Sequence, residues 1–200
     1  VYAHRSVRCM NQQTLDTLIR RYLEFRFPQS SFAWQGGEPS LAGLDFFQEV
    51  VRLEQKHGRG GQSVSNGFQT NGLLLDEDWG RFFARYYFLV GLSMDGPREV
   101  HDFYREDPAG AGTHERVQKA LRLLQRFQVT FNVLCVISEA NVRKASELYN
   151  YFRDLGVTHV QFIPCVERDP ETGRMAEFVA EPEAYGDFLC EMFDLWEEGD

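Results

Sequence analysis

The sequence predicts an α/β protein built on a parallel sheet with helical crossovers. Amphipathic helical segments alternate with short apolar segments along the chain, and strict alternation of this kind is typical of parallel sheets. Two apolar segments, 88–93 and 129–137, are hydrophobic on both faces, as buried parallel strands are. The alternation is compatible with an open doubly wound sheet and with a barrel or partial barrel.

The helices are predicted from apolar residues that recur at helical spacing. The predicted helices cover residues 14–25, 44–57, 77–86, 114–127, 142–152 and 182–196. Residues that favour a helix terminus flank them, and we expect these residues to cap or end the helices. These residues are Pro28, Asp76, Thr113, Asn141 and Pro182.

Five strands are predicted between these helices, at residues 31–34, 63–70, 88–93, 129–137 and 159–166. Polar and turn-forming residues follow their carboxyl ends, which form the binding face of parallel α/β folds. The clearest example is Gln35-Gly36-Gly37-Glu38. Two adjacent glycines let the backbone approach a ligand closely, and the glutamate can accept hydrogen bonds from a ligand amine. The spacing alone leaves an ordinary glycine-rich turn equally open.

Composition excludes several classes of protein. The chain has 200 residues, is 43% hydrophobic and 26% charged, and carries a formal net charge of -9. This composition is globular and argues against a disordered protein. An acidic chain is a poor candidate for nonspecific nucleic-acid binding and for an anionic membrane surface. No apolar run approaches the roughly 20 residues that span a bilayer, so no membrane partner is expected.

The sequence shows no local metal site and none of the common nucleotide or nucleophile motifs. The four cysteines, at positions 9, 135, 165 and 190, form no C-x-x-C pair and are interpreted as mostly reduced, buried thiols of a cytosolic protein. The five histidines are scattered and are interpreted as solvated or capping residues. A Walker lysine motif, G-x-G-x-x-G and G-x-S-x-G are all absent.

An ordered set of motifs resembles a known family. The segment F-A-W-Q-G-G-E-P-S-L, residues 32–41, is similar to the glycine motif of radical S-adenosylmethionine enzymes, and its extended form to that of the anaerobic sulfatase-maturating enzymes. Further matching segments follow in order at 69–72, 90–97, 101–105, 131–136 and 161–166. The resemblance spans most of the chain.

The resemblance implies a fold and an activity. The family's fold is a partial (β/α)6 barrel of the TIM-like type. Its members cleave S-adenosylmethionine reductively at a [4Fe–4S] cluster, and the resulting 5′-deoxyadenosyl radical abstracts hydrogen from the Cβ of a Cys or Ser in a sulfatase, which becomes Cα-formylglycine. The cofactor carries the radical chemistry and the protein orients it. The implied partners are a sulfatase polypeptide and an electron donor such as flavodoxin or ferredoxin, in the cytoplasm.

Residue roles follow from the resemblance position by position. The implied cofactor-binding residues are Gly36, Gly37, Glu38, Ser93, Arg105 and Val166. The two glycines and the glutamate match the motif that receives the methionyl amino group. The serine hydroxyl and the arginine guanidinium match positions that hold the cofactor, the latter through its carboxylate. The valine matches a hydrophobic position beside the adenine.

Three further residues are assigned to the substrate side of the pocket, namely Gln35, Asn71 and Asp95. Gln35 matches a position next to the peptide substrate in the family. Asn71 and Asp95 are expected to line the pocket, and either is equally compatible with a turn role.

The sequence departs from the family at the cluster motif, C-x-x-x-C-x-x-C, which is absent. Cys9 does not replace it, because a cluster needs three thiolates. We therefore expect residues 1–200 to be a partial radical SAM core domain, truncated at both ends. Its first strand and cluster loop would precede Val1, and an auxiliary-cluster domain of the SPASM type would follow. The chain alone is expected to contain no catalytic residue and no metal ligand, and to be inactive.

The sequence is compatible with two other functions. One is a related radical SAM enzyme that modifies a different peptide. The other is a non-catalytic cofactor- or peptide-binding domain that has lost its cluster loop.

Overall fold

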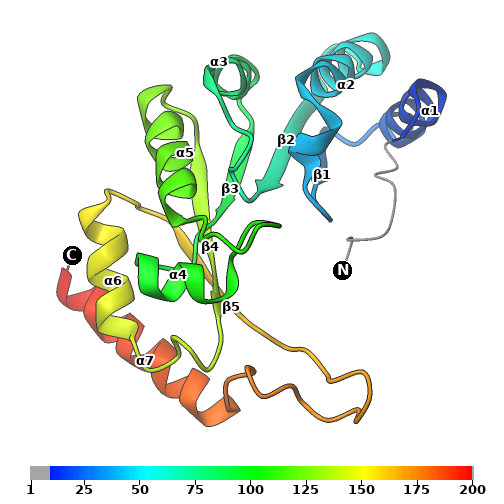
Figure 1. Cartoon of the computed structure of the whole chain (residues 1–200). Helices are drawn as coiled ribbons and strands as arrows, with labels where there is room; N and C mark the ends of the chain where they lie inside the picture. Colours follow the sequence, from blue (N-terminus) through cyan, green and yellow to red (C-terminus); the bar gives the residue numbers. More distant parts are fainter. Residues whose placement is uncertain (1–9, 200) are drawn as a thin grey trace. The chain divides into compact units, whose positions relative to one another are not determined.

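The computed structural model describes residues 10–199, which divide into two compact units. The first unit contains residues up to Gly91 together with Ala120–Thr130, and the second contains Leu92–Lys119 together with the chain from Phe131 onward. Cys9 lies outside the described residues. The helices and strands of each unit are labelled in Figure 1.

The first unit pairs two parallel strands and packs helices against them. Its elements are α1 (Gln12–Leu23), β1 (Gln29–Trp34), the short 3-10 helix η1 (Pro39–Ala42), α2 (Leu44–His57), β2 (Ser63–Thr70) and α3 (Glu77–Tyr86). In the parallel register, Gln29 lies opposite Ser63 and Trp34 lies opposite Phe68. Helices α1 and α2 lie side by side (Figure 1).

Aromatic side chains form the core of the first unit. The ring centroid of Phe68 on β2 lies 4.9 Å from that of Phe47 on α2 and 5.0 Å from that of Phe83 on α3. Trp79 contacts the same cluster, 5.3 Å from Phe68. Large aromatic rings in such tilted and edge-on arrangements bury much apolar surface, so this cluster fixes α2 and α3 against β2.

A chain of buried polar contacts also joins α2 to the strands. Trp34 Nε1 donates to Asn66 Oδ1 at 2.8 Å, and Asn66 Nδ2 donates to Glu54 Oε2 at 3.0 Å. Glu54 is only 7% exposed. Burial disfavours the charged carboxylate and raises the pKa of Glu54 to about 7, although the Asn66 hydrogen bond opposes this shift.

The second unit has the same construction of parallel strands and helices. Its own elements are α4 (Arg98–Tyr104), β4 (Phe131–Ile137), α6 (Ala145–Asp154), β5 (Val160–Pro164) and α7 (Pro182–Gly199). Strands β4 and β5 are parallel, with Val133 opposite Val160. Helix α7 lies along α6 (Figure 1) and buries Phe188, which contacts Phe162 of β5 with ring centroids 5.2 Å apart.

Two elements contain residues of both units, β3 (Leu89–Ser93) and α5 (His114–Arg126). The five strands form one sheet in chain order, β1-β2-β3-β4-β5. The predicted α/β class with five alternating strands is confirmed. Helix α4 and the 3-10 helix η1 are not among the predicted elements, because each is too short to show a period. Within residues 10–199, no helix combines the length and apolarity needed to cross a bilayer.

One predicted helix cap is wrong, and a second caps its helix through the backbone, because the Thr113 carbonyl accepts from the Val117 N–H. Asn141 does not begin α6, which starts at Ala145 with Lys144 before it. Its side chain instead closes a turn, because Oδ1 accepts from the Ser138 N–H at 2.8 Å. Thr113 does precede α5, but its hydroxyl donates to the Arg105 carbonyl at 3.0 Å, while Asp102 accepts from the His114 N–H.

The interpretation of the cysteines and histidines also needs correction. Cys135 is fully buried as expected, and burial raises the pKa of its thiol, but Cys165 is half-buried and Cys190 is exposed. His101 and His114 are neither solvated nor capping side chains, with exposures of 0% and 7%. Burial lowers the pKa of both rings.

Candidate functional site

The glycine pair after β1 has an open backbone in a conformation that favours glycine. Gly36 and Gly37 have φ values of +92° and +60°, a region that other residues rarely adopt. A Cβ built on either would meet no atom within 4 Å. Conformation rather than crowding therefore selects glycine here, and the loop leaves space for a ligand close to its backbone.

The Glu38 carboxylate joins the loop after β1 to the end of β2. Oε1 accepts hydrogen bonds from Ser40 N at 3.0 Å, Ser40 Oγ at 2.6 Å and Thr70 Oγ1 at 2.8 Å. Oε2 accepts from Asn71 N at 2.7 Å. Each carboxylate oxygen has two lone pairs, and Oε2 receives only this one bond from the described residues. Glu38 therefore stabilises two loops and keeps acceptor capacity for a ligand N–H.

The structure brings Gln35 and Asn71 to the same two loops. Gln35 is exposed directly after β1. Asn71 Oδ1 accepts from the Leu73 N–H at 3.0 Å, an arrangement that forms a turn. A turn role is thus visible for Asn71. Ser40 and Thr70, the partners of Glu38, are neighbours of the candidate site that sequence reasoning missed.

In the second unit, Asp95 and Arg105 form a bidentate ion pair. Arg105 Nε lies 2.5 Å from Asp95 Oδ2, and Arg105 Nη2 lies 3.0 Å from Asp95 Oδ1. Asp95 Oδ1 also accepts from the Val136 N–H of β4 at 2.9 Å. Asp95 therefore fixes the guanidinium relative to β4. The Arg105 side chain stays 27% exposed, and its Nη1 makes no bond to Asp95.

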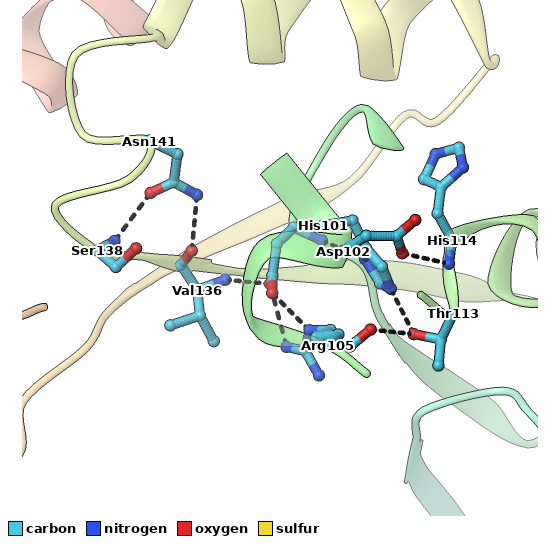
Figure 2. A network of polar contacts seen from close by, with 9 residues as sticks. His101, Asp102, Arg105, Thr113, His114, Val136, Ser138 and Asn141 are labelled. Atoms are coloured by element: carbon cyan, nitrogen blue, oxygen red, sulfur yellow. Dashed lines mark hydrogen bonds and ion pairs between the residues drawn. The ribbon is translucent and has the colours of Figure 1, made fainter. Parts of the chain in front are cut away.

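The buried ring of His101 contacts the backbone of Asp95. Its Nδ1 accepts from the Asp95 N–H at 3.2 Å, and its Nε2 lies 3.1 Å from Thr113 Oγ1 (Figure 2). Burial is the main cause that lowers the pKa of His101 to about 4, and the positive charge of Arg105 adds to it. The ring is therefore neutral near pH 7.

Asn141 bonds to the same residue of β4. Its Nδ2 donates to the Val136 carbonyl at 2.9 Å (Figure 2). Both backbone groups of Val136 are thus bonded to side chains. Asp95 and Val136 lie 41 residues apart, so local patterns carry no signal for their contact.

The other two predicted cofactor residues lie at strand ends. Ser93 is the last residue of β3 and is half-buried. Val166 follows β5, and its side chain is 72% exposed. Such exposure leaves an apolar surface that a flat ring could cover. Among the described residues, no group of three or more His, Cys, Asp or Glu side chains could hold a metal ion.

The chain is similar in sequence to anaerobic sulfatase-maturating enzymes. It is 39% identical over 194 residues to the Cysteine-type anaerobic sulfatase-maturating enzyme of Clostridium perfringens (strain 13 / Type A), a match that covers 97% of this chain and 52% of the relative. It is 33% identical to the Serine-type anaerobic sulfatase-maturating enzyme of Bacteroides thetaiotaomicron, over 100% of this chain and 52% of that protein. No family model matches. The chain spans about half the length of these curated relatives.

Solved structures agree with the sequence matches. Native anSMEcpe with bound AdoMet and Cp18Cys peptide superposes with a TM-score of 0.91 at 38% identity, over 98% of this chain and 55% of that one. Coproporphyrinogen III oxidase from Escherichia coli, a radical SAM enzyme, shares the fold with a TM-score of 0.63 at 13% identity. The predicted resemblance is therefore confirmed, and over nearly all of its length this chain is a homologue of part of the anaerobic sulfatase-maturating enzymes.

Proposed function

We propose that the full-length protein containing this chain is a radical S-adenosylmethionine enzyme that oxidises a Cys or Ser of a sulfatase to Cα-formylglycine. The observation that carries the proposal is the match, at 38% identity and a TM-score of 0.91, to a structure with AdoMet and a peptide bound. Relatives named as Cys-type and as Ser-type enzymes both match. The electron donor, of the flavodoxin or ferredoxin class, and a cytoplasmic location belong to the same proposal.

Two side chains, Glu38 and Arg105, carry charges opposite to those at the methionyl end of S-adenosylmethionine. That group carries an ammonium and a carboxylate. Glu38 offers a carboxylate oxygen that accepts one hydrogen bond from the described residues, and Arg105 offers a guanidinium whose Nη1 is not used by Asp95. Charge-assisted hydrogen bonds of these two kinds are strong. We therefore propose that Glu38 binds the ammonium, beside the open backbone of Gly36 and Gly37, and that Arg105 binds the carboxylate.

The remaining roles follow the same proposal. Ser93 would donate or accept a hydrogen bond at the cofactor, Val166 would contact the adenine, and Gln35 would contact the peptide. Asp95 would act on the cofactor through Arg105, because it holds the guanidinium in a bidentate ion pair and is itself bonded to β4. Asn71 would shape the loop that holds Glu38.

When bound with a [4Fe–4S] cluster, S-adenosylmethionine would supply the one-electron oxidation chemistry. Cluster ligands are not found among the described residues. In the proposal, this chain's own residues bind and orient the cofactor and present the peptide.

The test uses the full-length protein, reconstituted with iron and sulfide under anaerobic conditions. Peptides with a sulfatase C-x-P-x-R or S-x-A-x-R segment are incubated with S-adenosylmethionine and a reductant, and the aldehyde is detected by mass spectrometry and hydrazide trapping. We expect aldehyde from at least one peptide. Cofactor cleavage without any aldehyde would instead favour a related enzyme with another target. A full-length protein that assembles no cluster would favour the non-catalytic alternative.

A further inference from the structure

The ring of His101 contacts the backbone of both residues of the Asp95–Arg105 ion pair. It bonds directly to the backbone of Asp95, and it reaches the backbone of Arg105 through Thr113. Its Nδ1 accepts from the Asp95 N–H, and its Nε2 contacts Thr113 Oγ1 at 3.1 Å. Thr113 Oγ1 in turn donates to the Arg105 carbonyl at 3.0 Å, and the Arg105 N–H donates to the His101 carbonyl at 3.1 Å. Figure 2 shows Thr113 between the His101 ring and the Arg105 backbone.

The donors and acceptors allow one consistent direction for these bonds. A backbone N–H can only donate, so Nδ1 of His101 must accept from Asp95. The Thr113 hydroxyl uses its single proton on the Arg105 carbonyl, so it must accept from His101. The proton of the neutral imidazole therefore sits on Nε2.

We propose that His101, as the neutral Nε2–H tautomer, is a positioning residue that fixes Arg105 for the carboxylate of S-adenosylmethionine. The inference rests on the proposed function, because it assigns Arg105 to that carboxylate. Asp95 fixes the guanidinium, and the His101–Thr113 pair fixes the Arg105 backbone. The His101 ring thus supports both the side chain of Arg105, through Asp95, and its backbone, through Thr113. Arg105 is therefore already ordered before the cofactor binds, which lowers the entropic cost of binding.

A protonated ring would not fit this arrangement. A second proton on Nδ1 would face the Asp95 N–H, and the charge would add to that of Arg105. The charged or titratable groups that act on His101 are Arg105, Asp95, His114 and Asp102, and burial together with Arg105 outweighs the two carboxylates. The neutral form is therefore the one that supports the ion pair at physiological pH.

The test measures S-adenosylmethionine affinity by calorimetry in the full-length reconstituted protein, with the cluster oxidised so that the cofactor is not cleaved. His101→Phe keeps a flat ring and removes both polar contacts. Thr113→Val keeps the shape and removes only the hydroxyl, whereas Thr113→Ser restores it. We expect Kd to rise about tenfold in the first two variants, the loss of roughly one hydrogen bond to a binding group, and to rise by less than about threefold in Thr113→Ser.

Val100→Ala is the matched control, because Val100 is buried on the same helix and an alanine there removes only apolar packing. It should lower Tm while Kd changes by less than about twofold. The inference is overturned if Thr113→Val binds the cofactor as tightly as wild type, or if all variants weaken binding only in proportion to their Tm. If His101→Phe does not fold, the comparison of Kd between Thr113→Val and Thr113→Ser tests the inference. Wild-type protein without any affinity would instead sink the proposed function itself.

Discussion

The Glu38 carboxylate accepts hydrogen bonds only from neutral donors among the described residues. Four such bonds reach it from Ser40, Thr70 and Asn71. The residue therefore has a structural role in addition to the proposed cofactor role, and the two must be separated by experiment. Arg105 is the opposite case, because its charge already has a partner in Asp95.

Glu38→Ala should affect both roles. It removes the four hydrogen bonds, so we expect a loss of about 2 kcal/mol in the free energy of unfolding and weaker binding of S-adenosylmethionine. Ser40→Ala is the control, because it removes one hydroxyl contact and leaves the carboxylate in place. Calorimetry and urea denaturation measure both effects. Cofactor affinity that is the same in Glu38→Ala and in wild type would remove Glu38 from the binding site and leave only its loop role.

Asp95→Asn should weaken cofactor binding without touching the cofactor. The amide keeps the shape but loses the negative charge that holds the guanidinium, so we expect the free energy of unfolding to fall by about 2 kcal/mol and the cofactor Kd to rise. Asp107→Asn is a suitable comparison, because Asp107 pairs with Arg116 at the longer distance of 3.5 Å and should matter little. Unchanged affinity in Asp95→Asn would show that Arg105 needs no such partner.

At the scale of the elements, α2 carries an ionisable group into the core. Glu54 has its pKa raised from 4.5 to about 7 by burial. In the unfolded chain the group ionises near its ordinary value, so between these two values the folded state binds more protons. The free energy of unfolding contributed by Glu54 is therefore fully present below about pH 4.5 and is lost as pH rises toward 7.

Glu54→Gln tests this linkage, because the amide oxygen can still accept from Asn66 and cannot ionise. The free energy of unfolding of the variant, relative to that of wild type, should increase by up to roughly 3 kcal/mol from pH 4.5 to pH 8. Urea denaturation across that range measures this difference. Glu49→Gln on the same helix is the control. The hydrogen bond from Arg52 lowers the pKa of Glu49, so the pH dependence of its free energy of unfolding relative to wild type should have the opposite sign. A pH-independent difference between Glu54→Gln and wild type would contradict the prediction.

Helix α3 contains a glycine for a packing reason. A Cβ at Gly80 would lie 2.5 Å from a ring carbon of Phe127. Helix propensity alone predicts a gain of about 1 kcal/mol for Gly80→Ala, but we expect a loss of about 1–3 kcal/mol from overpacking. Chemical denaturation decides between the two signs. The double variant with Phe127→Leu should recover part of the loss, and a stabilised single variant would show that the ring moves at little cost.

For the whole molecule, two elements are shared by the compact units, β3 and α5. Unfolding one unit would therefore disrupt β3 and α5, each of which continues into the other unit. We expect one cooperative thermal transition, with far-UV and near-UV circular dichroism giving the same midpoint. Two separated transitions would show that the units fold independently despite the shared elements.

The sequence predicted the larger elements well and the polar contacts poorly. The bounds of α2 and β2, Leu44–His57 and Ser63–Thr70, match the prediction because a glycine lies within two residues of each end of both segments. Helix α4 was missed because its seven residues show no clear apolar stripe. The loop with Gly36, Gly37 and Glu38 was found from local spacing, whereas its partner Thr70 lies 32 residues away from Glu38. Such contacts depend on tertiary structure.

The Asp95–Arg105 pair has a consequence for how the cofactor is captured. An arginine whose charge is cancelled within the protein projects little electrostatic field into solution, so it cannot attract an anionic group from a distance. The bond to a carboxylate then forms only at contact, where dissolved salt screens it weakly. The contribution of Arg105 to the association rate of S-adenosylmethionine should accordingly vary little with potassium chloride concentration, and a stopped-flow comparison of wild type with Arg105→Gln at increasing ionic strength would measure this.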